Sequence, residues 1–305
     1  MHKKEMQLLA YILSYPLFWL ISLLPFRVLY FLSDITCFIT YRIIGYRRLV
    51  VRQNLALALP HLTEKERKDI EKKSYSHFCD TFFEIAKSLT ITDKQIRKRF
   101  TFTNIELAHE YEDKGKSVVL FTGHYASYEW LLSMNMYFKS FKGIGIYKIV
   151  RNKYFDALVK KMRGRYGAEL IGTKNIIPAM RQNQRKSIKG FYGFISDQSP
   201  KKSSIIYYGK FFGVTVPMQV GGEMLAKKLD MNAMFARIDK TGRGYYQCTF
   251  VPLEGSPKDY PNFAVTDWFM NLLEEQIREK PEYYLWTHKR FKHRLDDTVT
   301  DQTNP

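Results

Sequence analysis

The chain has 305 residues, enough for one large or two small domains. Its 48 Lys and Arg residues exceed its 30 Asp and Glu residues by 18, and this balance indicates an anionic partner: nucleic acid, a membrane face, or an acidic protein or substrate. Hydrophobic residues make up 45% of the sequence, which excludes an intrinsically disordered chain. Three widely spaced cysteines without a Cys-x-x-Cys pair support neither a disulfide framework nor a zinc site.

The amino-terminal part is strongly apolar. No charged residue occurs over Met6–Phe26, and a second apolar stretch, Val28–Tyr41, is interrupted only by Asp34. The first stretch is long enough to cross a bilayer, although Pro16 near its middle would kink a helix. No small-residue cleavage site follows, so a cleaved signal peptide is not expected. Three alternatives stay open for residues 1–45: an uncleaved membrane anchor, an in-plane interfacial hairpin, or a buried core helix.

Helix and strand patterns alternate in the rest of the chain. A capping box, Thr63 to Glu66, opens a helix predicted to run to about Leu89. Strands are then predicted over Ser117–Gly123, Gly143–Lys148, Ala168–Gly172, Lys189–Ser196, Asn232–Lys240 and Tyr245–Glu254. Helices are predicted over Ala126–Lys139, Asn152–Tyr166, Asn175–Lys186, Pro217–Leu229 and Val265–Lys280. This order predicts an α/β domain over residues 46–296, with a mixed, mostly parallel sheet flanked by helices, and a flexible polar tail over 297–305.

The segment Phe121–Glu129 carries the clearest chemical signal. An apolar strand ends at Gly123, His124 follows, and a helix is predicted to begin near Ser127. Catalytic groups collect at the carboxyl ends of strands in such sheets. Glu129, in an early helical turn, could reach back to the imidazole, and a carboxylate on one ring nitrogen fixes the tautomer and raises the basicity of the other.

A His–carboxylate dyad of this kind can remove a proton from a substrate hydroxyl, and a nearby helix N-terminus offers N–H groups to an oxyanion. No serine or cysteine elbow lies beside it, so direct acyl transfer to an alcohol fits better than a covalent intermediate. The alternative is a structural His124 at a strand end and a solvated Glu129.

Four segments together resemble a known family. FTGHYASYEW resembles the His-x4-acid block of glycerolipid and lysophospholipid acyltransferases, and its Glu version resembles the bacterial lipid A late acyltransferases, the lauroyl and myristoyl transferases. The basic segment Tyr147–Gly167, the Asp-Gln and Phe-Phe-Gly blocks within Gly193–Gly213, and the segment Pro281–Phe291 resemble further blocks of that family. Their order and spacing agree over about Val118–Arg294.

The resemblance implies roles for individual residues. His124 would be the general base and Glu129 its partner, and Arg163 would hold a phosphate or carboxylate. Asp197 would orient the acceptor or Arg163. Three more basic residues would contact anions: Lys148, Arg151 and Arg165. Since the family often has Arg where Lys148 stands, two-pronged phosphate binding is not expected at that position. A solvated surface charge, or for Asp197 a strand-end turn, is the alternative at each.

The implied activity is that of a membrane-associated O-acyltransferase. It would move a fatty acyl chain from an acyl-carrier protein thioester to a hydroxyl of a lipid A precursor, at the cytoplasmic side of a bacterial inner membrane. The arginines that follow residue 41 favour the same side. Acyl-carrier protein is acidic, so the basic chain would meet it faster. No metal or tightly held cofactor is expected.

Two alternatives concern the partner. The acceptor could instead be an aminolipid or a lysophospholipid, since resemblance fixes reaction type better than substrate. A membrane-tethered nucleic-acid-binding protein also fits the charge and the 15% aromatic content, but the sequence carries no RNP-type, KH or helix-turn-helix signature.

Overall fold

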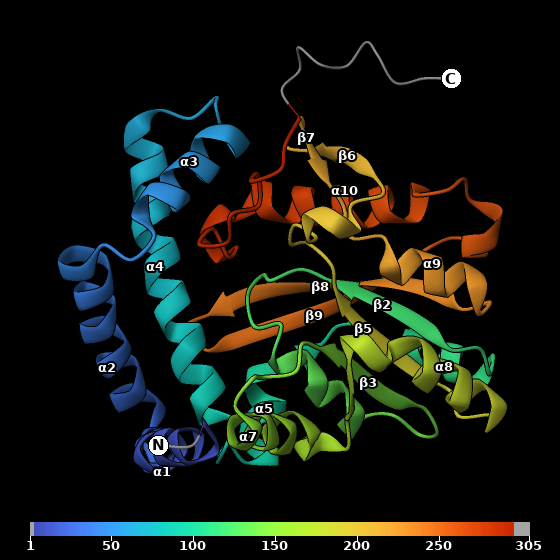
Figure 1. Ribbon diagram of the computed structural model, residues 1–305, viewed down its shortest axis with the longest axis horizontal. Coiled ribbons are helices and arrows are strands. Elements are labelled where there is room, and N and C mark those ends of the chain that lie inside the picture. The colour runs from blue at the N-terminus through green and yellow to red at the C-terminus, as the bar shows by residue number, and fades with distance from the viewer. Residues whose placement is uncertain (1–2, 296–305) are drawn as a thin grey trace.

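The computed structural model describes residues 3–295, and a seven-stranded sheet forms its centre (Figure 1). The strand order is β1-β9-β8-β2-β5-β3-β4. Strands β8, β2, β5, β3 and β4 run parallel, whereas β9 pairs antiparallel with β8. The predicted mixed, mostly parallel sheet is therefore confirmed. The strands are β1 (Phe100–Phe102), β2 (Val118–Thr122), β3 (Lys142–Tyr147), β4 (Glu169–Gly172), β5 (Gly190–Ile195), β8 (Asn232–Gly242) and β9 (Tyr245–Pro252).

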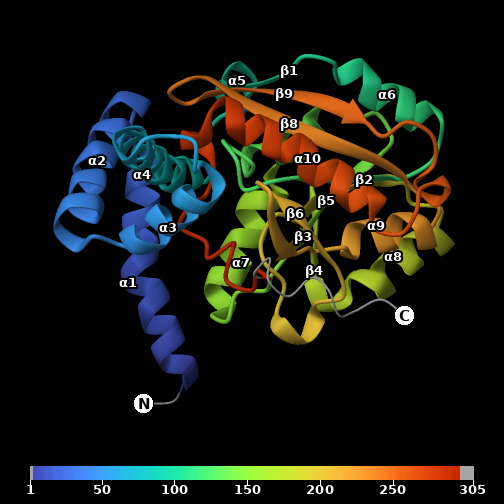
Figure 2. The same cartoon turned by 90° about the horizontal axis from the view of Figure 1, so that it is seen from above.

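Helices flank this sheet, as predicted. Figure 1 shows α9 and α10 on one side of the strands and α5 and α7 on the other, and in Figure 2 α1 to α4 gather beside the sheet. The predicted tail over 297–305 lies outside the described residues. The α-helices are α1 (Lys3–Leu23), α2 (Phe26–Phe38), α3 (Arg48–Ala58), α4 (Glu64–Lys87), α5 (Asp93–Arg99), α6 (Ile105–Asp113), α7 (Lys153–Arg163), α8 (Ile176–Arg185), α9 (Gly221–Lys228) and α10 (Ala264–Glu279).

Helix α4 begins at the predicted capping box. The backbone N–H of Glu66 donates to the Thr63 hydroxyl at 3.3 Å, and the Glu66 carboxylate accepts from the Thr63 N–H at 2.7 Å. Two of the unpaired donors of the first turn are thus satisfied, which fixes the start of a helix of 24 residues. Helices α1, α2 and α3 all pack against α4.

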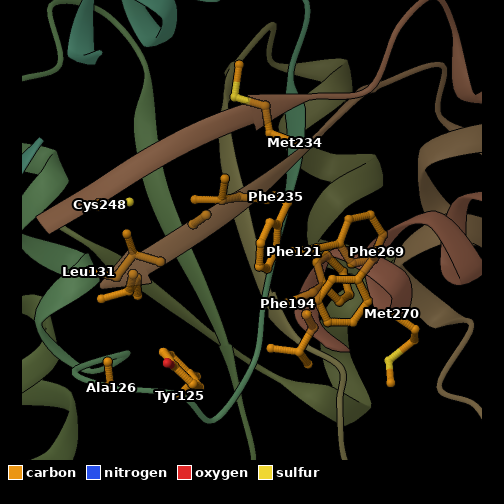
Figure 3. Packing of buried hydrophobic residues seen from close by; sticks show 14 of the residues in the cluster. Phe121, Tyr125, Ala126, Leu131, Phe194, Met234, Phe235, Cys248, Phe269 and Met270 are labelled. Carbon is orange, nitrogen blue, oxygen red and sulfur yellow. The ribbon is translucent and has the colours of Figure 1, made fainter. Parts of the chain in front are cut away.

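The two faces of β2 serve different purposes. All five of its residues are buried, as expected for a central parallel strand. Phe121 faces α10, where its ring stacks on Phe269 with centroids 5.2 Å apart, and Phe194 of β5 packs beside it (Figure 3). Burying each such ring contributes about 1.5–3 kcal/mol. Leu120 and Thr122 point to the opposite face, where they line a cavity.

The helix predicted over Ala126–Lys139 is not formed as expected. Turns follow β2, and only Trp130–Met136 is helical, as a 3-10 helix (η2). The backbone explains the difference: Ala126 has φ +49°, its N–H donates to the Tyr283 carbonyl at 3.0 Å, and the His124 carbonyl accepts from the Leu285 N–H at 3.1 Å. Pairing with a distant segment replaces the hydrogen bonds of a local helix.

A small hairpin also escaped the sequence patterns. Strands β6 (Tyr208–Phe211) and β7 (Val214–Pro217) pair antiparallel. Both turn residues, Phe212 at φ +54° and Gly213 at φ +75°, are left-handed, which is the geometry of a two-residue type I′ turn. The Phe-Phe-Gly block is therefore a hairpin turn, in which Phe211 is fully buried.

Candidate active site

A cavity of about 940 Å³ lies on the face of the sheet away from α10. Its walls come from β2, β3, β5, η2 and α7, and they are largely apolar, with small residues at Gly143, Gly145 and Gly193. Among the described residues that line it, five are basic and one is acidic: Lys148, Arg151, Arg163, Lys174 and Lys201 against Glu129. The cavity therefore combines an apolar interior with a cationic set of polar groups.

The strand register brings His124 and Asp197 together. Thr122 of β2 lies opposite Ile195 of β5. His124 comes two residues after Thr122, and Asp197 comes two residues after Ile195, so the two site residues leave the sheet side by side. The His124 Nδ1 lies 2.7 Å from the Asp197 Oδ1. The Asp197 side chain is 1% exposed and that of His124 is 19% exposed, so the carboxylate lies behind the ring and the ring reaches the cavity.

Gly123 allows this strand end to approach α10. A Cβ atom at that position would lie 2.6 Å from Leu273 Cδ1, closer than side chains tolerate. Glycine thus lets the end of β2, and with it His124, approach α10 without displacing the Leu273 side chain.

The pair shifts the acidity of both groups. Burial lowers the pKa of His124, but the charge of Asp197 and its hydrogen bond outweigh burial, so the pKa stands above its ordinary value of 6.5. Burial raises the pKa of Asp197, whereas the charge and hydrogen bond of His124 bring it below its ordinary value of 3.8. An ionised Asp197 beside an imidazole of raised basicity is the arrangement expected of a general base and its orienting carboxylate.

The second ring nitrogen of His124 contacts a different side chain. The Gln198 side-chain amide nitrogen lies 3.3 Å from His124 Nε2. An amide N–H donates to a ring nitrogen that carries a lone pair, so the proton belongs on Nδ1, toward Asp197, and Nε2 is the proton acceptor. Gln198 therefore occupies the position from which a substrate hydroxyl would approach Nε2.

Glu129 does not hold the imidazole, and the predicted contact is corrected here. Its carboxylate pairs with Arg163: the guanidinium Nε donates to Oε2 at 2.8 Å, and Nη2 donates to Oε1. The reason is the missing helix, because the turns after His124 carry Glu129 toward α7 instead of back to the ring. Asp197, which the sequence analysis assigned to the acceptor or to Arg163, takes the place on Nδ1.

Glu129 and Arg163 nevertheless act on the ring through space. The charge of Glu129 raises the pKa of His124, and that of Arg163 lowers it. Both side chains line the same cavity as His124. The assignment of Arg163 to a substrate anion stays a prediction. Such an anion would have to compete with the Glu129 carboxylate, which already accepts two hydrogen bonds from the guanidinium.

The remaining predicted basic residues separate into two groups. Lys148 and Arg151 are exposed and line the cavity. Arg165 faces elsewhere: its Nη1 lies 3.2 Å from the Leu89 carbonyl and 3.4 Å from that of Ser88, beyond the end of α4. Its predicted contact with a substrate anion has no support from this placement.

Three cavity residues were missed by the sequence analysis. Gln198 directly follows Asp197, so its place in the Asp-Gln block could have indicated that it lies at the site. Lys174 and Lys201 lie in segments with no pattern beyond their charge. Only the meeting of the loops after β4 and β5 places these two at the same cavity.

The carboxyl-terminal segment supports the site from behind. Tyr283 and Leu285 hold the backbone around His124, and Tyr125 forms a β-bridge with Tyr284. Arg290 is 1% exposed, and its Nη1 donates to the Pro217 carbonyl at 3.0 Å. Burial lowers the pKa of Arg290, and the nearby Tyr284 and Asp197 oppose that shift, so the guanidinium lies within electrostatic reach of the buried carboxylate.

An α/β sheet with a His–Asp pair at a strand end, beside an apolar cavity with a cationic lining, is an arrangement typical of an enzyme that uses a general base. Residues 2–293 match the sequence profile of the family described as "Bacterial lipid A biosynthesis acyltransferase". The chain belongs to this family, and the predicted resemblance is confirmed. It is thus an acyltransferase of lipid A biosynthesis.

Individual relatives are distant but align over most of their length. The chain is 23% identical over 279 residues to the lipid A biosynthesis lauroyltransferase of Escherichia coli (strain K12), covering 90% of this chain and 89% of that protein. It is 24% identical over 283 residues to the lipid A biosynthesis palmitoleoyltransferase of the same organism, with the same coverage. A lipid A biosynthesis acyltransferase of Haemophilus influenzae is 24% identical over 257 residues, covering 82% and 77%.

Proposed function

We propose that this chain transfers a fatty acyl group from an acyl-carrier protein thioester to a hydroxyl of a lipid A precursor, with His124 Nε2 as the general base. The observation that carries the proposal is the position of His124: Asp197 holds its Nδ1, and its Nε2 is directed toward Gln198, a residue of the 940 Å³ cavity. The apolar interior suits an acyl chain, and the basic side chains suit the phosphates of both substrates.

The reaction follows from this geometry in two proton transfers. The acceptor hydroxyl replaces the Gln198 amide at Nε2, which takes the proton as the oxygen attacks the thioester carbonyl. The new C–O bond forms, the C–S bond breaks, and the thiolate leaves with the proton returned by the imidazolium. Asp197 stays ionised throughout and stabilises the positive ring.

Glu129 has a positioning role in this mechanism. Its two hydrogen bonds orient the Arg163 guanidinium at the wall of the cavity, and its charge supports the basicity of His124. Arg163 and the neighbouring basic residues then attract the phosphate of the acceptor or of the donor's phosphopantetheine arm. Lys148, Arg151, Lys174 and Lys201 complete this cationic set.

The net charge of +18 supports the acidic carrier protein as donor. Since that donor belongs to the cytoplasm, the proposal places the active site on the cytoplasmic side of the inner membrane. A purified chain tested with the same acyl group on acyl-carrier protein and on coenzyme A distinguishes the donors. The carrier-protein thioester is expected to be the better substrate, with a rate advantage that falls as salt is added.

The acceptor is tested by mass spectrometry of lipids from cells with and without the gene. Lipid A that lacks one acyl chain in the deleted strain is the expected result. A chain missing from an aminolipid or a phospholipid, with lipid A intact, would contradict the proposed acceptor.

A further inference from the structure

Helix α1 lies lengthwise against the rest of the protein. Its partly covered positions recur every three or four residues, which places them on one side of the helix. The Tyr11 ring stacks on Tyr154 of α7 with centroids 5.7 Å apart, and Phe18 lies 6.0 Å from Phe82 of α4. One stripe of α1 is therefore an ordinary helix–helix contact with both α7 and α4.

Both ends of α1 are hydrogen-bonded to residues of the acyltransferase domain. Near its start, the Asn152 side-chain amide donates to the Gln7 carbonyl at 2.9 Å. At its end, the Lys87 ammonium donates to the carbonyls of Ser22 at 2.7 Å and Leu24 at 2.8 Å. The start of α7 and the end of α4 thus hold the two ends of one apolar helix.

The rest of the α1 surface carries exposed apolar side chains, and α2 also exposes large apolar side chains. Soluble proteins rarely expose so many large apolar side chains on neighbouring helices, and such surfaces mark contacts with a protein or a membrane. The exposed large side chains on α1 are Met6, Leu8, Leu9, Ile12, Leu13, Leu17, Trp19, Leu20 and Leu23, and on α2 they are Val28, Phe31, Ile35 and Phe38. Hydrocarbon chains are the surroundings that suit both sets.

We propose that α1 and α2 lie in the plane of a single leaflet and that neither crosses the bilayer. By length and apolar composition, α1 alone could span a membrane. A spanning α1 would, however, carry α7 to the bilayer interior, because Tyr154 and Phe155 contact the middle of α1. Charged side chains are costly there.

The charges of α7 fit the surface of a leaflet instead. Lys153, Lys160 and Lys161 are all exposed on α7. With α1 in the plane of the membrane, these ammonium groups are expected at headgroup level, where anionic phosphates attract them. The partner of the α1–α2 surface is therefore a leaflet that contains anionic lipid.

This arrangement has a consequence for substrate entry that rests on the proposed function. The Arg151 carbonyl accepts from the Gln7 side chain at 3.4 Å, and Arg151 also lines the catalytic cavity. Helix α1 therefore adjoins the cavity at the level of the leaflet. A lipid acceptor can move sideways from the leaflet to His124 without leaving the membrane surface.

Cysteine labelling tests the topology directly. Lys4→Cys lies at the exposed start of α1 and Gln184→Cys on the exposed surface of α8. Each variant is treated with a membrane-impermeant maleimide in sealed vesicles of either orientation, and the parent chain gives the background from Cys37, Cys79 and Cys248. We expect both sites to react from the same side. Reaction of Lys4→Cys from the opposite side would overturn the proposal.

Spin labels measure the same property along the helix. Leu9, Leu13 and Leu20 are exposed on α1. In the plane of a leaflet, labels at the three sites share one shallow depth. In a spanning helix, Leu9 and Leu20 are about 16 Å apart along the axis and Leu13 is deepest, so graded depths would contradict the in-plane arrangement. Neither measurement depends on turnover, so its failure is distinct from a failure of the acyltransferase proposal.

Discussion

Two pairs, each of a carboxylate and a basic side chain, lie at one cavity: Asp197 with His124, and Glu129 with Arg163. They differ in the property of the basic group that the carboxylate affects. Asp197 is almost fully buried and contacts an imidazole that can gain or lose a proton, whereas Glu129 is 14% exposed and contacts a permanently charged guanidinium. In the proposed mechanism, the first pair sets the basicity of the proton acceptor, and the second pair orients the Arg163 guanidinium. The short spacing between His124 and Glu129 in the sequence predicts the opposite assignment, with Glu129 on the ring.

For the His124–Asp197 pair, the pH range that favours stability differs from the pH range that favours the proposed activity. Because the pKa of His124 is raised, its contribution to stability is complete below the ordinary value of 6.5 and is lost as pH rises through the folded-state pKa. Because the pKa of Asp197 is lowered, its contribution is present above 3.8 and is lost as pH falls through the folded-state pKa. The pair therefore stabilises the fold most between about pH 4 and pH 6.5, whereas the proposed action of His124 as a base requires a neutral ring and a higher pH.

Removal of the base tests the first pair most severely. His124→Ala is expected to lower kcat by about 10⁴-fold, the upper range for acid–base assistance, with the fold retained by circular dichroism. His61→Ala, an exposed histidine outside the site, serves as the matched control. Near-normal turnover of the His124 variant would exclude it as the base.

A change of its partner should affect the pH profile as well as the rate. Asp197→Asn removes the charge that raises the pKa of His124. We expect kcat/KM to fall by about 10³-fold and its acidic limb to move to lower pH. The wild-type limb is expected above pH 6.5. An unchanged profile in the variant would show that Asp197 does not govern the basicity of the ring.

The second pair should show smaller and coupled effects. Glu129→Gln is expected to lower kcat/KM by about 10²-fold, and Arg163→Lys by about 10-fold, since an ammonium cannot copy two parallel hydrogen bonds. Because the two residues form one unit, the double variant should be little worse than Glu129→Gln alone. Additive losses would show that they act independently.

Measuring donor and acceptor separately, at low and high salt, locates the substrate that Arg163 serves. If Arg163 contributes only to the field for donor encounter, Arg163→Lys should be nearly silent and both proteins should slow with salt. A lysine variant equal to wild type for both substrates would leave Lys148 as the better candidate for the anion.

The smallest effect is expected at the apolar wall of the cavity, which contains neither of the two pairs. A Cβ at Gly145 would lie 2.9 Å from Leu170 Cδ2 and 3.5 Å from Leu132 Cδ2, so Gly145→Ala narrows the apolar interior. We expect a few-fold shift toward shorter acyl donors, below the roughly 10–200-fold that a full methylene can reach, because the Leu170 side chain can move aside in part. Gly164→Ala, where an added Cβ meets nothing within 4 Å, is the control. Unchanged chain preference would place the acyl chain elsewhere.

The sequence predicted a large part of this fold because the signals were local. The apolar run Ser117–Gly123 became β2, and the capping box at Thr63 set the start of α4. Each signal depends on hydrogen bonds or burial within a few residues. The short elements β1, β6 and β7 were missed, since three or four residues carry no period of their own.

The sequence by itself determined the α/β alternation, the apolar amino terminus and the segments that hold the chemistry. It also brought His124 to a strand end. Only the tertiary structure decided which carboxylate contacts the ring, because that choice depends on the register of β2 against β5 and on a carboxyl-terminal segment that replaces a helix with turns. For α1, the composition permits a spanning helix, and the contacts at both of its ends, made by residues far away in the chain, are the basis of the proposed in-plane arrangement.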